Sequence, residues 1–179
     1  MQAYLDKIKY KIDKYFEFVA KPFIKLNISP NHISILCLIF GLVSVWFLFD
    51  NHYLFVLFMI IHLFFDKLDG VVARLTNKVT KRGEWIDYFI DQVVAIVLLA
   101  KAFFFLNPYL VVLTLLYFVI HHGVFVLTKN RKYLIGSRTT LTICFIFTLF
   151  NLGLLISVIS SFFGILGQII MFLKRKKNK

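Results

Sequence analysis

Residues 33–49 read ISILCLIFGLVSVWFLF, a stretch without a charged side chain. Residues 139–173 form a second such stretch. A helix needs about 20 apolar residues to cross the hydrocarbon core of a bilayer. Of the 179 residues, 60% are hydrophobic and 17% are charged, which leaves too little charge to cover a soluble domain. The sequence therefore predicts an all-α integral membrane protein.

The hydrophobic pattern divides into six transmembrane helices. Short polar turns at residues 50–52 and 107–108 separate neighbouring spans. The last two spans are divided near residues 151–153, and one longer helix there, giving five spans, is the alternative. We expect the spans at residues 31–49, 53–74, 84–105, 109–128, 139–153 and 155–173.

An amphipathic helix is expected before these spans. Apolar residues recur at helical spacing over residues 4–20, and lysines occupy the other faces. This pattern predicts a helix that lies in the membrane interface over residues 1–22 and ends at Pro22. Either Ser29 or Asn31 is expected to cap the first span.

The basic residues indicate how the chain lies in the membrane. The formal net charge is +12, but Lys and Arg lie between and beyond the spans, so topology and anionic lipid explain them better than nucleic acid does. With six spans, all of them except Lys101 fall on one side, which we expect to be cytoplasmic together with both termini. In a prokaryote the membrane would be the plasma membrane. The predicted single membrane domain, residues 1–179, comprises the interfacial helix, a bundle over about 31–173 and a basic tail at 174–179.

The chain has nine acidic residues, and four of them are aspartates inside the second and third expected spans. Each aspartate near the bilayer centre costs about 2.5 to 3.5 kcal/mol, and clustered carboxylates repel one another. Asp66 and Asp69 are three residues apart and Asp87 and Asp91 are four apart, so each pair shares one helix face. The two helices are antiparallel, and the pairs can converge. Hard carboxylate oxygens in such a group bind Mg²⁺, Mn²⁺ or Ca²⁺.

Small residues and one cation accompany the aspartates. Gly70, Ala73 and Gly83 lie on or near the acidic faces, where the missing side chains leave room for a substrate. Arg74 lies one turn beyond Gly70 and can hold a phosphate. Carboxylates that bind metal, a cation for phosphate and cleared space together predict phosphoryl or phosphatidyl transfer.

Residues 66–91 match a family signature. The signature of the CDP-alcohol phosphotransferases reads D-x2-D-G-x2-A-R-x8-G-x3-D-x3-D, and this chain resembles it at every fixed position. The matching string is Asp66-Lys-Leu-Asp69-Gly70-Val-Val-Ala73-Arg74, eight further residues, then Gly83-Glu-Trp-Ile-Asp87-Tyr-Phe-Ile-Asp91. The resemblance extends to the six spans and the interfacial N-terminal helix.

The resemblance implies a site for a CDP-linked lipid and a pair of divalent ions, Mg²⁺ or Mn²⁺. The four aspartates would hold the metal pair, and Asp91 would also be the catalytic base on the acceptor hydroxyl. The donor would be CDP-diacylglycerol or CDP-archaeol, and CMP would leave. Such enzymes usually form homodimers, with the site open to the cytoplasm. The nucleotide contacts would come from Asp69, Gly70, Ala73, Arg74 and Gly83.

The residues define the acceptor alcohol less well. The string Asp87-Tyr-Phe-Ile-Asp91-Gln92 matches none of the patterns typical of the glycerophosphate, inositol phosphate, serine or choline subfamilies. Arg131, Lys132 and Arg138 flank the ends of the fourth and fifth spans. They can bind the phosphate of a phosphorylated polyol, such as inositol phosphate or glycerol phosphate. Ordinary positive-inside charge explains them equally well.

Two other functions would use similar residues. An intramembrane prenyltransferase also holds pyrophosphate with aspartates and Mg²⁺, although its aspartate spacing differs and it usually has more spans. A small cation transporter or channel subunit would use the acids as its ion site, nearer the bilayer midplane.

For some polar and small residues the sequence leaves open whether they serve the site, the packing of helices or a dimer contact. His62, one turn before Asp66, is either a partner of the site or a core histidine. Packing is expected for at least one of His121 and His122. A stripe of small residues in the last span either packs internally or forms a dimer seam; it comprises Ser157, Ser160, Ser161, Gly164 and Gly167.

Overall fold

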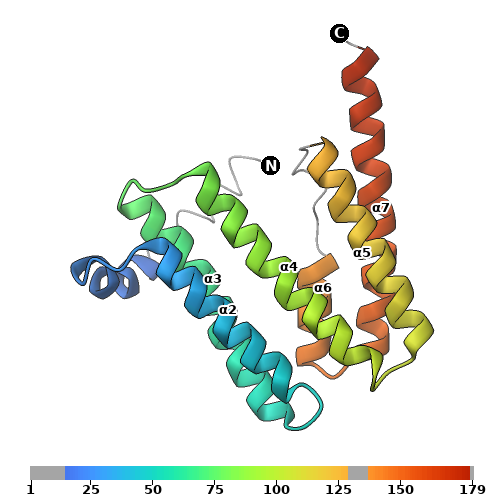
Figure 1. The fold of residues 1–179 in the computed structure, drawn as a ribbon, viewed down its shortest axis with the longest axis horizontal. Helices are drawn as coiled ribbons and strands as arrows, with labels where there is room; N and C mark the ends of the chain where they lie inside the picture. The colour runs from blue at the N-terminus through green and yellow to red at the C-terminus, as the bar shows by residue number, and fades with distance from the viewer. Residues whose placement is uncertain (1–14, 129–136, 178–179) are drawn as a thin grey trace. The chain divides into compact units, whose positions relative to one another are not determined.

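The computed structural model describes residues 15–128 and 137–177, and every regular element there is a helix (Figure 1). The chain divides into two compact units, Met1–Val94 and Ala95–Lys179. The predicted all-α fold is confirmed, and the first four expected spans agree with α2 to α5 within three residues at each end. After a helical stretch at residues 15–25 come α2 (Pro30–Phe47), α3 (His52–Leu75), α4 (Lys81–Phe103), α5 (Pro108–Thr128), α6 (Ser137–Ile146) and α7 (Phe150–Lys177).

Polar residues start three of these helices as the turn pattern predicts. Asn51 accepts a hydrogen bond from the backbone N–H of Leu54 at 3.2 Å, and Asn107 accepts one from Tyr109 at 3.1 Å. Both satisfy amide groups that a helix leaves unpaired in its first turn. Ser29 occupies the cap position of α2, but its hydroxyl makes no cap bond and lies 3.0 Å from Nδ1 of His32.

The first unit is organised by the packing of α2 against α3. Gly41 lies where α2 also meets α4. A Cβ atom at Gly41 would lie 2.6 Å from Cγ2 of Val94 and 2.9 Å from Nδ1 of His62. The missing side chain therefore lets three helices approach closely, on the stretch of α4 that follows the two aspartates.

The helical stretch at residues 15–25 covers one end of this helix pair. Ala20 is fully buried against Ile33 of α2 and Leu68, Val71 and Val72 of α3. The predicted end at Pro22 is wrong, because the helix continues and Leu26 donates its N–H to the carbonyl of Pro22 at 3.0 Å. The helix ends before Asn27, whose φ of 54° is left-handed, a conformation that asparagine tolerates at helix ends. Residues 1–14 of the expected interfacial helix lie outside the described part.

The second unit packs α5 and α6 against α7. Thr114 of α5 lies against Leu154 of α7, and His121 lies against Gly164 further along both helices. The two helices therefore run side by side in the same direction (Figure 1). A Cβ atom at Gly164 would overlap the His121 ring. The small-residue stripe packs internally at the positions that are buried, which are Ser157, Ser161 and Gly164.

The boundary between α6 and α7 differs from the prediction. Two separate helices are present, but the expected boundary near residues 151–153 is wrong, because the turn comprises residues 147–149. The alternative of one long helix is wrong as well. Thr148 adopts a φ of 60°, and Leu149 donates its N–H to the carbonyl of Cys144 at 2.7 Å. Gly153 lies inside α7. A Cβ atom there would be 2.6 Å from Cβ of Cys144, so this glycine permits close helix packing rather than a turn.

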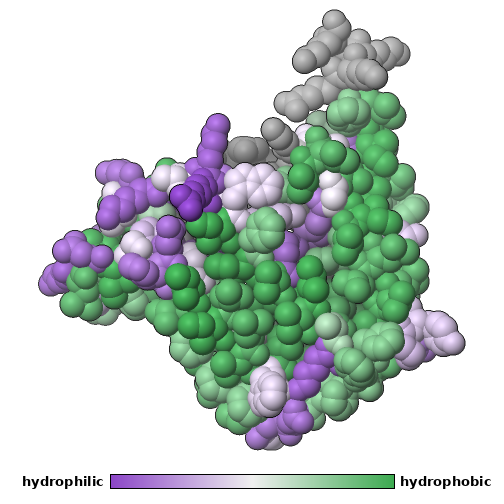
Figure 2. Space-filling model, viewed as in Figure 1, coloured by the Kyte–Doolittle hydropathy of each residue, from purple (hydrophilic) through white to green (hydrophobic). Residues whose placement is uncertain are grey.

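Within residues 15–128 and 137–177, three helices are long and apolar enough to cross a membrane: Pro30–Phe47, Pro108–Thr128 and Phe150–Lys174. The α3 and α4 helices are long enough, but they carry the charged residues of the signature. The α6 helix has 10 residues and is therefore about 15 Å long. Figure 2 shows hydrophobic side chains over most of the visible face of the first unit, with hydrophilic ones gathered toward the end that carries residues 76–80.

We predict that Gly41→Ala destabilises the fold by about 1–3 kcal/mol, because the added methyl group overlaps α4 and His62. Gly123→Ala is the matched control, since a Cβ atom there meets nothing within 4 Å. This second variant should gain up to about 1 kcal/mol from helix propensity. Thermal unfolding of both variants in detergent micelles measures the difference. Equal melting temperatures would show that Gly41 is not needed for close packing.

Candidate metal and phosphate site

Three of the four predicted aspartates converge. One carboxylate oxygen each from Asp66, Asp87 and Asp91 lies within 4.8 Å of the other two, and all three residues are half-buried. Asp66 comes from α3, whereas Asp87 and Asp91 lie one turn apart on α4. The antiparallel connection through residues 76–80 brings the two faces together, as the spacing predicts. Three hard oxygen donors at this separation fit a divalent cation such as Mg²⁺ or Mn²⁺.

Asp69 lies beside this group but is held differently. Its side chain is only 5% exposed, and Oδ2 accepts a hydrogen bond from the Ser34 hydroxyl at 2.5 Å. It is close enough to Asp87 and Asp66 for their charges to interact. Ser34 belongs to α2, so a third helix contributes to the site. The sequence analysis missed this residue, and a serine four residues after Pro30 in an apolar run was the only signal for it.

The predicted phosphate residues lie at the C-terminal end of α3. A Cβ atom at Gly70 would lie 3.2 Å from Nη1 of Arg74 and meets no other side chain within 4 Å. Ala73 and Arg74 are both half-buried. Gly70 therefore leaves space beside the guanidinium group rather than at a packed helix contact. This arrangement can admit an anion next to Arg74.

Gly83 lies in the first turn of α4 and not in the preceding loop. Its backbone N–H donates to the Thr80 hydroxyl at 3.0 Å, and Glu84 donates to the Thr80 carbonyl at 3.1 Å. Thr80 thus caps α4 and fixes where the helix begins. Asp87 and Asp91 follow one and two turns later.

His62 lies on α3 one turn before Asp66 and contacts α2. It is buried, and its Nδ1 lies 2.9 Å from the carbonyl oxygen of Cys37 and 3.1 Å from the Cys37 sulfur. These contacts assign His62 a packing role. In the second unit, His121 is fully buried against Gly164, and Nδ1 of His122 lies 2.7 Å from the Phe118 carbonyl oxygen. Both of these histidines also contribute to packing.

The expected acceptor residues lie outside what the structure describes. Arg131 and Lys132 fall within residues 129–136, and Arg138 lies in the first turn of α6 with an undescribed side chain. Their predicted role is therefore untested.

A family model for CDP-alcohol phosphatidyltransferase matches residues 27–174. The chain belongs to this family. The match covers α2 to α6 and most of α7, far more than the signature itself. It confirms the resemblance on which the predicted enzyme class rests.

Curated relatives match about half of the chain. An archaetidylinositol phosphate synthase of Pyrococcus horikoshii is 37% identical over 89 residues, covering 49% of this chain and 47% of the relative. A bifunctional IPC transferase and DIPP synthase of Aquifex aeolicus is 29% identical over 87 residues, covering 49% of this chain and 20% of the relative. An uncharacterized protein of Aquifex aeolicus is 30% identical over 87 residues. The chain therefore aligns with less than half the length of each of these relatives.

We predict that Asp87→Asn weakens Mn²⁺ binding at least about tenfold, because a neutral amide replaces one of three charged ligands. Asp50→Asn, in the turn between α2 and α3, is the matched control with the same chemical change. Electron paramagnetic resonance of free Mn²⁺ in titrations of the purified protein measures both affinities. An unchanged affinity in the Asp87 variant would contradict a metal site in this group.

Proposed function

We propose that this protein transfers a phosphatidyl-type group from a CDP-linked lipid to the hydroxyl of a small polar alcohol in phospholipid biosynthesis. The observation that carries the proposal is the convergence of Asp66, Asp87 and Asp91 within 4.8 Å in a chain of the CDP-alcohol phosphatidyltransferase family. An intramembrane prenyltransferase or a cation transporter would not account for that family match. The donor is CDP-diacylglycerol or CDP-archaeol.

The reaction breaks a phosphoanhydride bond of the donor and forms a phosphoester bond to the acceptor. The acceptor hydroxyl attacks the phosphate that bears the lipid, and the bond from that phosphate to CMP breaks. Asp91 takes the proton of the hydroxyl as general base. Asp66, Asp69, Asp87 and Asp91 would hold two Mg²⁺ or Mn²⁺ ions, which supply positive charge to the pyrophosphate. The hydrogen bond from Ser34 holds the Asp69 carboxylate in place for this purpose.

The nucleotide contacts follow from the end of α3 and the start of α4. Arg74 pairs with a phosphate of the donor, and Gly70 provides the space beside its guanidinium group. Asp69, Ala73 and Gly83 complete the contacts to the cytidine diphosphate.

The acceptor we propose is a phosphorylated polyol, with inositol phosphate as the first candidate. The relative with 37% identity is named archaetidylinositol phosphate synthase, and that name includes a phosphorylated inositol headgroup. Arg131, Lys132 and Arg138 supply the basic residues that such a phosphate requires. Glycerol phosphate is the alternative of the same chemical class.

The membrane setting is part of the proposal. Three candidate spans support an integral membrane protein, and we propose that α3, α4 and α6 complete a six-span domain. The distribution of Lys and Arg supports cytoplasmic termini and a cytoplasmic site. We also propose a homodimer, as is usual in this family.

We predict that Asp91→Asn lowers CMP release from a CDP-linked lipid about 10²-fold or more, because the amide cannot accept the acceptor proton. The assay mixes purified protein, Mg²⁺ and either CDP-diacylglycerol or CDP-archaeol with inositol phosphate, glycerol phosphate, inositol or serine. Inositol phosphate is expected to give the fastest release, and chelation of the metal should stop it. Asp50→Asn should keep the wild-type rate.

Two outcomes would refute the proposed reaction. Wild-type protein that releases no CMP with any acceptor, or an Asp91→Asn variant with full activity, would each do so. Competition by prenyl diphosphates but not by cytidine nucleotides would favour the prenyltransferase alternative. Metal flux into liposomes without nucleotide would favour the transporter.

We predict that Gly70→Ala raises the KM for the CDP-linked lipid about tenfold, the loss expected when a charge-assisted hydrogen bond to phosphate is disturbed. The added methyl group would lie 3.2 Å from Nη1 of Arg74 and displace that guanidinium group. Gly123→Ala serves as control because its environment is open. Steady-state kinetics with varied donor separate KM from kcat. An unchanged KM would show that Arg74 does not depend on this space.

A further inference from the structure

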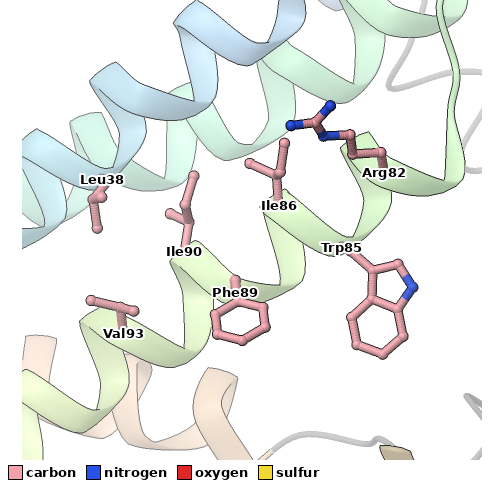
Figure 3. A pocket seen from close by; sticks show the side chains of 7 residues that line it. All are labelled: Leu38, Arg82, Trp85, Ile86, Phe89, Ile90 and Val93. Carbon is pink, nitrogen blue, oxygen red and sulfur yellow. The ribbon is translucent and has the colours of Figure 1, made fainter.

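An apolar groove runs along α4 on the side that faces α2 (Figure 3). Its volume is about 350 Å³, and its lining is almost entirely hydrophobic. Leu38 of α2 forms one wall, and Ile86, Ile90 and Val93 of α4 form the other, while Trp85 and Phe89 line the groove on the side of α4 away from α2. Arg82 extends over Ile86 and supplies the charged side chain at one end of the groove.

The dimensions of the groove fit one hydrocarbon chain. From Arg82 to Val93 the helix advances eleven residues, or about 16 Å. This length is roughly half of a hydrocarbon core of about 30 Å, which is the depth of one leaflet. Arg82 lies in the first turn of α4, where a helix also favours a negative charge. A cation at the start of an apolar groove one leaflet deep complements an anionic phospholipid.

The charged end of the groove is turned away from the aspartates. Arg82 precedes Asp87 by five residues, which places the two side chains about 140° apart around the helix. A phosphate bound to Arg82 on the groove side is therefore separate from the phosphates that metal ions on the carboxylates would hold. This separation favours a resident lipid of the bilayer over the CDP-linked donor.

We propose that this groove binds an anionic phospholipid of the surrounding leaflet, with Arg82 on the lipid phosphate and one chain along Leu38, Ile86, Ile90 and Val93. The lipid is not a substrate, and its binding does not depend on the proposed reaction. Its negative headgroup distinguishes it from the zwitterionic lipids of the same chain length.

The test is native mass spectrometry of the full chain in detergent, titrated with dioleoyl phosphatidylglycerol or with phosphatidylcholine of the same chains. Wild-type protein should bind the anionic lipid about tenfold more tightly. Arg82→Gln should lose this preference, whereas Lys81→Gln, the adjacent exposed cation outside the groove, should keep it. Equal preference in both variants would overturn the proposal.

A second pair of variants tests the apolar part. Val93 and Val97 are each 37% exposed on α4, and only Val93 lines the groove. Val93→Trp should fill the groove and weaken both lipids, and Val97→Trp should not. Circular dichroism confirms that each variant is folded, and a misfolded Val93→Trp is replaced by Leu38→Trp.

Three results would assign the groove to another occupant. Displacement of phosphatidylglycerol by about one tenth as much CDP-diacylglycerol would assign it to the donor, because a site that reads only negative charge would not prefer the nucleotide. Conversion of a dimer to a monomer by Val93→Trp, with lipid binding unchanged, would assign it to a second copy of the chain. Equal lipid binding by Val93→Trp and Val97→Trp, without a change of mass, would show that the groove binds neither. Each result overturns the proposal and leaves the transfer reaction to be tested by CMP release.

Discussion

Mutual repulsion of the carboxylates on α3 and α4 is the constraint on which the rest of the first unit depends. Asp66, Asp87 and Asp91 hold oxygen atoms within 4.8 Å of one another, and the carboxylate of Asp69 lies close enough to interact with them. Without a bound cation such a group opposes the packing of its own helices. The same charges keep α3 and α4 out of the set of described helices that composition alone marks as candidate membrane spans. The first unit must therefore hold α3 and α4 in place by contacts away from the aspartates.

These contacts lie on both sides of the carboxylate group. On one side, Gly41 lets α2 approach His62 and Val94. On the other, the helical stretch at 15–25 covers Leu68, Val71 and Val72, which lie on α3 among the signature residues. No carboxylate takes part in these contacts. The apolar core thus fixes the separation of the acids, and a metal ion would then meet ligands that are already positioned.

The sequence predicts features that depend on local spacing. A separation of three or four residues places each acid pair on one helix face, and the short connection makes the two helices antiparallel. The convergence of Asp66 with Asp87 and Asp91 follows from these two facts. Ser34 could not be predicted in the same way, because it is 35 residues from Asp69 and only the packing of α2 on α3 brings them together. The side chains of Arg131, Lys132 and Arg138 remain outside the description, so the acceptor site is still a prediction.

The glycines serve different purposes in this fold, and the residue type alone does not distinguish between them. The sequence predicts a turn at Gly153, yet this glycine permits the close approach of α6 and α7, and the turn instead contains Thr148 in a left-handed conformation. Gly41 and Gly164 likewise lie against side chains of neighbouring helices. At Gly70, by contrast, an added Cβ atom would meet only Arg74, a residue of the same helix. Helix packing therefore accounts for the first three glycines but not for Gly70, whose missing side chain agrees with the phosphate contact that we propose for Arg74.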